Sequence, residues 1–149
     1  MRSFLTTTKV SFWPLLVSIS MVLVAGCAIE GLRYDTDTNV SLAGAQEVPA
    51  VTTSARGSGA IMVGSDKSVS GRVATYGIVS MVAHIHVGAP GVNGPIIIPL
   101  TRIVDDVWSV PAGAKLTDAQ YESYKAGNLY VNVHTAAHKG GEIRGHLKP

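Results

Sequence analysis

Short runs of β-favouring residues, each ended by a turn signal, are the feature that most limits how this chain can fold. From residue 40 to residue 147, stretches rich in Val, Ile, Thr and Tyr alternate with clusters of Gly, Pro, Asn and Ser. Strands at this spacing without long helices predict an all-β fold, an antiparallel β-sandwich or barrel. The predicted strands are Val40–Gln46, Gly57–Val63, Ser68–Tyr76, Val82–Val87, Pro95–Leu100, Leu129–His134 and Glu142–Leu147.

One short helix is predicted near residues 117–126. Thr117 is a typical N-cap, Asp118 and Gln120 occupy the first turn, and Gly127 follows the last turn. About ten helical residues are too few to be stable alone, so we expect the helix to pack on the sheet.

The N-terminal 26 residues have the composition of a secretory signal. Arg2 and Lys9 supply positive charge, and a mostly apolar run follows over residues 12–24. That run has about 13 residues, fewer than the roughly 20 that a membrane-spanning helix needs. We therefore expect residues 1–26 to be a cleaved signal peptide, with an uncleaved membrane helix as an alternative.

Cys27, the only cysteine of the chain, follows the small residues Ala25 and Gly26. The run Val24-Ala25-Gly26-Cys27 resembles the lipobox of bacterial lipoproteins. The resemblance implies cleavage before Cys27, lipidation of its thiol (a diacylglycerol, with a further acyl chain such as palmitate on the new amino terminus) and a membrane anchor. Ala28 beside it implies the outer membrane. A soluble secretory signal cut near Ala25 is the other explanation.

Removal of the signal would leave 123 residues, enough for one domain with a core of its own. We expect a polar tether over residues 27–39 and a domain over residues 40–149. The signal holds two of the 12 Lys and Arg residues, so the remaining ten equal the 10 Asp and Glu residues. This balance, with no basic patch, argues against a nucleic-acid partner.

Histidines recur on one side of the predicted strands. Side chains alternate between the two faces of a strand, so His84 and His86 share a face while Ile85 points to the other. His134 shares a face with Tyr130 and Asn132 on a second strand, and His146 shares one with Glu142 and Arg144 on a third. We expect these faces to point to solvent and the apolar alternates to form the core.

A pair of imidazoles two residues apart on a strand can bind one metal ion, and a third from a neighbouring strand completes the set. Neutral imidazole suits copper and zinc. His84, His86 and His134 are therefore the candidate metal ligands, whereas His138 lies in a predicted turn. A solvated polar face with no metal is the competing interpretation. No nucleophile and base form a recognisable catalytic pair, so no catalytic residue is predicted.

Four segments together resemble the CHRD domain, which is named after the repeats of chordin. They are Leu42–Pro49, Ala83–Ile96, Asn128–Thr135 and Gly140–Leu147. The resemblance implies a β-sandwich with an immunoglobulin-like or superoxide-dismutase-like Greek key. It matches the recurring histidines of the family to His84, His86 and His134. His146 departs from the usual Gly-Gln-Leu ending and is a poorer candidate ligand. The fold implies little about activity.

These observations lead to one leading hypothesis and two alternatives. The leading hypothesis is a lipid-anchored, non-enzymatic binding protein of the bacterial cell envelope that holds copper or zinc in a histidine cluster. The first alternative is a copper-dependent enzyme acting on a small oxidant, and the second is a structural or adhesive domain without a ligand.

Overall fold

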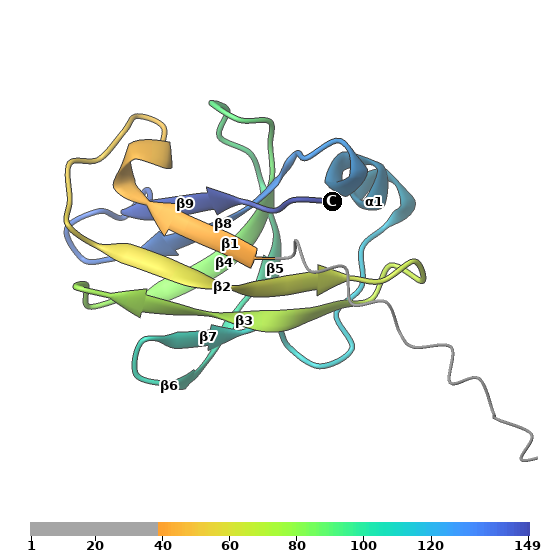
Figure 1. Cartoon of the computed structure of the whole chain (residues 1–149), viewed down its shortest axis with the longest axis horizontal. Helices are drawn as coiled ribbons and strands as arrows, with labels where there is room; N and C mark the ends of the chain where they lie inside the picture. The colour runs from red at the N-terminus through yellow and green to blue at the C-terminus, as the bar shows by residue number, and fades with distance from the viewer. Residues whose placement is uncertain (1–38) are drawn as a thin grey trace, which may run out of the picture. The chain divides into compact units, whose positions relative to one another are not determined.

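Residues 39–149, the part of the chain that the computed structural model describes, form one antiparallel sheet and one α-helix (Figure 1). The sheet order is β5-β4-β8-β9-β1-β2-β3-β7-β6. The strands are β1 (Asn39–Ala43), β2 (Arg56–Val63), β3 (Val69–Tyr76), β4 (Val82–Val87), β5 (Ile96–Pro99), β6 (Thr101–Val104), β7 (Val107–Ser109), β8 (Leu129–His134) and β9 (Ile143–His146).

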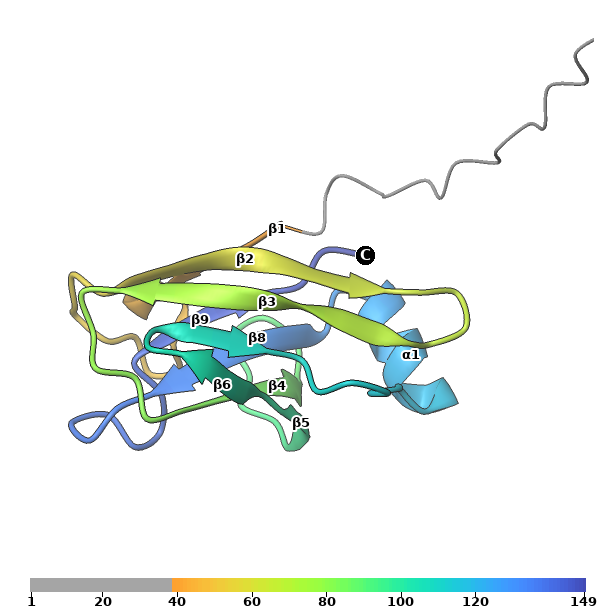
Figure 2. The same ribbon diagram turned by 90° about the horizontal axis from the view of Figure 1, so that it is seen from below.

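The two edges of this sheet are brought together by the chain itself. β5 and β6 stand at opposite ends of the strand order, yet only Leu100 separates them in sequence. The sheet must therefore curl until its edges meet, and Figure 2 shows β2 and β3 in one layer above β4, β5 and β8 in the other. The result is a nearly closed, sandwich-like all-β fold, which confirms the predicted fold class.

Alternation places one face of each layer in a common apolar core. Val131 and Val133 of β8 are fully buried there, together with Ile85 of β4 and Leu42 of β1. β8 lies near the middle of its layer, between β4 and β9. Its other face is also largely buried, because Tyr130 and Asn132 are each only 1% exposed. β8 therefore has a covered polar face as well as an apolar one.

The sequence prediction differs from the structure most in three strands, whereas the ends of the others differ by at most one residue. β6 and β7 were not predicted; they form a hairpin whose turn contains Asp105 and Asp106. β1 ends at Ala43, earlier than predicted, because a short 3-10 helix, η1 (Gly44–Gln46), replaces the last part of the strand.

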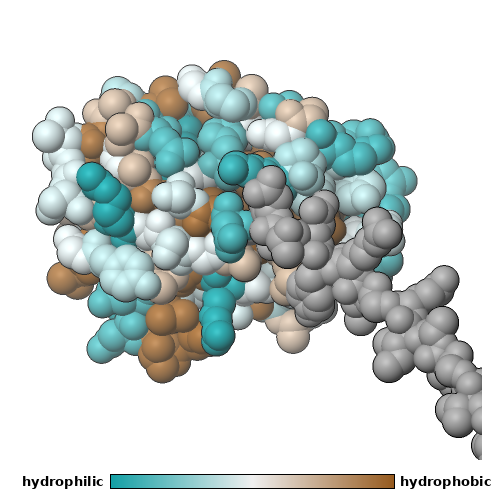
Figure 3. Space-filling model, in the orientation of Figure 1, coloured by the Kyte–Doolittle hydropathy of each residue, from teal (hydrophilic) through white to brown (hydrophobic). Residues whose placement is uncertain are grey.

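β6 lies at the sheet edge, and Figure 3 shows apolar surface over it.

The helix α1 (Asp118–Lys125) forms where the sequence predicts it. The hydroxyl of Thr117 accepts a hydrogen bond from the backbone N–H of Gln120, and the Gln120 side chain accepts one from the backbone N–H of Thr117. This capping box satisfies two amide groups that a helix start leaves unpaired. Tyr124 is the buried residue of α1 and joins the core.

The expected signal peptide, the lipidation site at Cys27 and the expected tether up to residue 38 lie outside the described residues, and Asn39, the last residue of that tether, belongs to β1. Within residues 39–149, α1 is the only α-helix, and it is neither long nor apolar enough to cross a membrane.

Candidate metal centre

The strand register places three rows of polar side chains on the outer face of β4, β8 and β9. His84 lies opposite Asn132, which lies opposite Arg144. In the next row, His86 lies opposite Tyr130. His134 lies opposite Val82, at the end of β8. Because neighbouring strands in a sheet are about 4.8 Å apart, this arrangement brings residues distant in sequence into contact.

The three candidate ligands converge on this face. One nitrogen from each of His84, His86 and His134 lies within 4.8 Å of the other two. Nδ1 of His84 and Nε2 of His134 are 3.1 Å apart. Two imidazole nitrogens bound to one ion through bonds of about 2.0–2.1 Å lie about 3.3–3.6 Å apart in tetrahedral or trigonal geometry. An approach of at most about 1.5 Å by the most distant nitrogen would therefore complete a three-nitrogen set.

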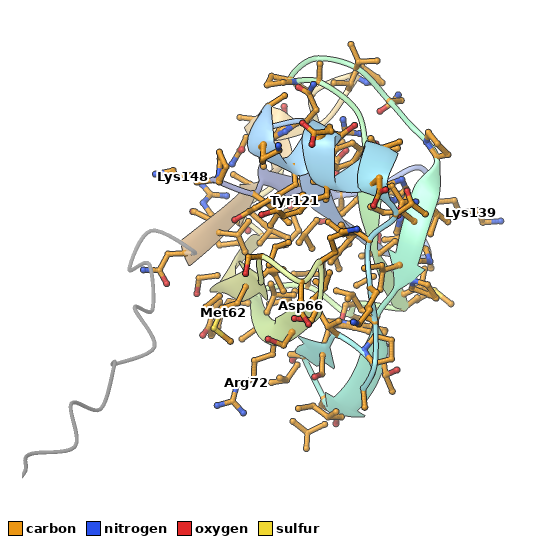
Figure 4. All side chains as sticks on the ribbon, turned by 90° about the vertical axis from the view of Figure 1, so that its right-hand side faces the viewer. Met62, Asp66, Arg72, Tyr121, Lys139 and Lys148 are labelled. Atoms are coloured by element: carbon orange, nitrogen blue, oxygen red, sulfur yellow. The ribbon has the colours of Figure 1, made fainter. Side chains whose placement is uncertain are left out.

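Backbone carbonyls fix the proton positions of two of the rings. Nδ1 of His86 lies 2.9 Å from the carbonyl oxygen of Gly94, and Nδ1 of His134 lies 3.0 Å from that of Lys139. A carbonyl oxygen can only accept, so both Nδ1 atoms carry the hydrogen and both Nε2 atoms of the neutral rings are free to accept. The Lys139 side chain itself points away from the sheet (Figure 4).

This pattern resembles the outer shell of protein metal sites, where a ligating histidine donates its second ring N–H to a carbonyl or carboxylate. Nε2 of His86 is buried and has no hydrogen-bond partner in the described part of the chain. Nε2 of His134 faces Nδ1 of His84, which must donate to it when no ion is present. A metal ion bound between the three rings would satisfy all three nitrogens.

The polar face is not open to solvent, and the sequence prediction was wrong on this point. His86 is 8% exposed, and Tyr130, Asn132 and Arg144 are 2% exposed or less, although His84 and His134 keep partial exposure. Two connections cover the face: residues 44–55 between β1 and β2, and residues 88–95 between β4 and β5, here the β4–β5 loop (Figure 1).

A buried ion pair holds these connections in place. Oε2 of Glu47 lies 3.1 Å from a guanidinium nitrogen of Arg144, and both side chains are almost fully buried. The amide nitrogen of Asn132 also donates to Glu47. Arg144 donates to the carbonyl of Val92 and to the side chain of Asn93 in the β4–β5 loop. Arg144 thus joins β9 to both covering connections.

Sequence reasoning assigned no role to Glu47. The residue lies in a turn region without strand or helix periodicity, so alternation gives no information about its side chain. Its one signal is its position within Leu42–Pro49, the first of the four segments that resemble the CHRD domain.

Burial shifts the titration of the cluster. The pKa values of His84, His86 and His134 are all lowered, first by removal from water. Neighbouring imidazoles lower the pKa values of His84 and His86 further, and the positive charge of Arg144 lowers those of His86 and His134. Lowered pKa values keep the rings neutral near pH 7, the form that binds metals. Burial raises the pKa of Glu47, and the charge of Arg144 opposes that shift.

The other two histidines lie outside the cluster. His146 lies on β9, opposite Tyr130 of β8, and its Nδ1 lies 3.3 Å from the carbonyl oxygen of Gly127. His138 lies in the turn between β8 and β9, where its backbone N–H donates to Thr135. Neither belongs to the group of nitrogens that converge.

Fold and site together define an antiparallel β-sandwich with a partly covered cluster of three histidines on one face. The CHRD domain family matches residues 38–147, which is most of the chain, and the chain belongs to that family. Comparison with curated proteins gave no match, and comparison with solved structures gave none either.

Proposed function

We propose that this CHRD-domain protein binds one copper or zinc ion through His84, His86 and His134. The main support is that three imidazole nitrogens, from two neighbouring strands, lie within 4.8 Å of one another. Two of the rings are held by carbonyls in the tautomer that leaves Nε2 unprotonated. The lowered pKa values also favour the neutral rings.

The donor set favours copper or zinc over harder ions. The cluster contains three imidazoles and no carboxylate. Magnesium and calcium prefer oxygen ligands, whereas imidazole suits copper and zinc. Three nitrogens leave one coordination position of a four-coordinate ion for water or another small ligand.

We further propose that the protein acts as a binding protein anchored in the bacterial cell envelope, in the outer membrane, through lipid on Cys27. The support is the run Val24-Ala25-Gly26-Cys27 after a basic and then apolar segment. Acyl chains add about 0.8 kcal/mol of membrane affinity per buried methylene, so several chains hold a protein firmly.

Metal analysis tests the binding proposal. The untagged protein purified from its native envelope without chelators should contain close to one copper or zinc ion per chain. The variant His134→Ala, purified in parallel, should contain little. A metal-free wild-type protein that also takes up neither ion on dialysis would contradict the proposal and favour a structural or adhesive role.

A further inference from the structure

The backbone of Gly94, in the β4–β5 loop, makes two hydrogen bonds to the face that carries the histidines. Its N–H donates to the hydroxyl of Tyr130 at 3.0 Å, and its carbonyl accepts from Nδ1 of His86 at 2.9 Å. A Cβ at this position would lie 1.7 Å from the carbonyl oxygen of Val87. Only glycine therefore lets the loop approach β4 closely enough to make both hydrogen bonds.

Tyr130 is itself held rigidly. Tyr130 is only 1% exposed. Its ring stacks on the ring of His86, with centroids 4.9 Å apart and planes inclined by 5°. The guanidinium carbon of Arg144 lies 4.1 Å from the centre of the Tyr130 ring. Stacking on His86 and the cation–π contact with Arg144 leave the hydroxyl of Tyr130 one position, the one that meets Gly94.

The same chain of contacts sets the proton on His86. Because the Gly94 carbonyl accepts a hydrogen bond from Nδ1–H of His86, Nε2 is the ring nitrogen with a free lone pair. That Nε2 is buried without a hydrogen-bond partner among the described residues. Without the Gly94 carbonyl, nothing in these contacts would prevent the His86 ring from carrying its hydrogen on Nε2, the tautomer that cannot bind a metal through that atom.

We propose that Tyr130 is a positioning residue of the metal centre. It holds the backbone of Gly94 in place, so that the Gly94 carbonyl keeps the Nε2 lone pair of His86 available to the ion. This inference rests on the proposed function and adds the β4–β5 loop to the metal centre. Arg144 supports the same arrangement, since it donates to Val92 and Asn93 of that loop.

Removal of one oxygen atom, the hydroxyl oxygen of Tyr130, tests the inference. Tyr130→Phe keeps the ring that stacks on His86 but removes the acceptor for the Gly94 N–H. We expect a ten- to hundredfold loss of zinc affinity, about the loss that outer-shell changes cause at metal sites. The ¹⁵N chemical shifts of His86 should change from those of the Nδ1–H tautomer to those of a mixture. A merely structural role for Tyr130 would not change that tautomer signature.

Tyr124→Phe is the matched control. Tyr124 is a second buried tyrosine, on α1, and its hydroxyl donates to the carbonyl of Lys148. This variant loses the same atom, and we expect wild-type zinc affinity and wild-type His86 shifts. The midpoint of thermal unfolding, measured on all three proteins, separates a loss of stability from a loss of metal binding.

Hydrogen exchange provides a test in the wild-type protein that does not depend on the folding of a variant. Zinc should slow exchange of the Gly94 amide hydrogen, because a bound ion holds His86 and, through it, the loop. Equal zinc affinity in wild type and Tyr130→Phe, or a Gly94 amide whose exchange zinc does not change, would overturn the inference and leave the metal site standing. A wild-type protein that takes up neither zinc nor copper would overturn both.

Discussion

Nδ1 of His84 and Nε2 of His134 lie 3.1 Å apart, although 50 residues separate the two histidines in the chain. β4 and β8 are antiparallel neighbours in which His84 is opposite Asn132, so His134 is its diagonal neighbour on the same face. Diagonal neighbours on a face are within reach of long or aromatic side chains. This contact already has nearly the separation that two imidazoles adopt on one metal ion.

Replacement of one cluster histidine should remove most of the stabilisation by metal. Zinc or copper(II) at a hundredfold excess over Kd should stabilise the wild-type protein by about 2.7 kcal/mol, because the ion binds the folded state only. His134→Ala should lose most of the resulting rise in melting temperature. His138→Ala removes a histidine of the β8–β9 turn and should keep it. Equal shifts in both variants, measured by differential scanning fluorimetry, would contradict the assignment of His134.

The free energy of unfolding of the metal-free protein should fall as the solution is acidified below about pH 6.5. His84, His86 and His134 have lowered pKa values in the folded state, whereas imidazole in an unfolded chain titrates near 6.5. Between the folded and unfolded pKa values the unfolded chain binds more protons, so acidification favours unfolding. Full stability from these groups is present above about pH 6.5 and is lost as the pH falls through the lowered values.

Zinc binding should follow the same titration. Only neutral imidazole binds the ion, so the lowered pKa values should let binding persist somewhat below pH 6.5 before protons displace the metal.

Urea unfolding of the metal-free protein between pH 5 and pH 8 checks the predicted fall in the free energy of unfolding. His84→Gln serves as the comparison and should show a shallower fall. A fall that is equally steep in the wild type and in His84→Gln would show that the histidines are not held neutral by the fold.

A charge on the core face of β8 should unfold the protein. Val133 is fully buried among apolar side chains. Val133→Asp would place a carboxylate there without a partner, and we expect a loss of more than about 3 kcal/mol. Val104→Asp is the control: Val104 is 61% exposed on β6, so that change should cost no more than about 0.5 kcal/mol. Similar melting temperatures for the two variants would contradict the strand register.

The buried pair Glu47–Arg144 should show strong coupling. Either single change, Glu47→Gln or Arg144→Met, leaves the other charged group buried without its partner, and we expect each to cost about 3–5 kcal/mol. The double variant should cost clearly less than the sum of the two. Chemical denaturation of all four proteins gives the coupling energy, and additive losses would show that the 3.1 Å contact contributes little in solution.

Cys27→Ser should release the protein from membranes. The prediction comes from Val24-Ala25-Gly26-Cys27 at the end of the N-terminal apolar run. Fractionation of cells that express each form checks it, and intact-mass analysis of the wild-type protein should show acyl chains on a chain that begins at residue 27. A mature wild-type protein with an unmodified thiol would contradict lipidation.

Alternation predicted most of the strands and the apolar core, but not which polar face is covered. The pattern of Leu129–His134 shows that Val131 and Val133 share one side, and it contains no information about residues 44–55 or 88–95, which cover the other side. Tyr130 and Asn132 therefore looked solvent-exposed. Contacts such as Glu47 with Arg144 join segments far apart in the chain, and a single acidic residue in a turn gives no sign of its partner.

The edge of the sheet was equally hard to predict. Leu100 is the single residue between β5 and β6, so no turn signal marks the point where the chain crosses from one edge to the other. β7 has three residues, Val107–Ser109, too few for an alternating pattern to be recognised. The convergence of the histidines, in contrast, follows from strand parity plus one neighbour relation, β4 beside β8.

X-ray absorption at the zinc edge tests the central claim most directly. The full-length protein, loaded with one equivalent of zinc, should show a first shell with three imidazole nitrogens at about 2.0–2.1 Å, with the outer-shell scattering that imidazole rings produce. The same sample of His134→Ala should lose at least one of those nitrogens. A wild-type first shell made of oxygen alone, or zinc that washes out before one equivalent is retained, would contradict a metal centre at His84, His86 and His134.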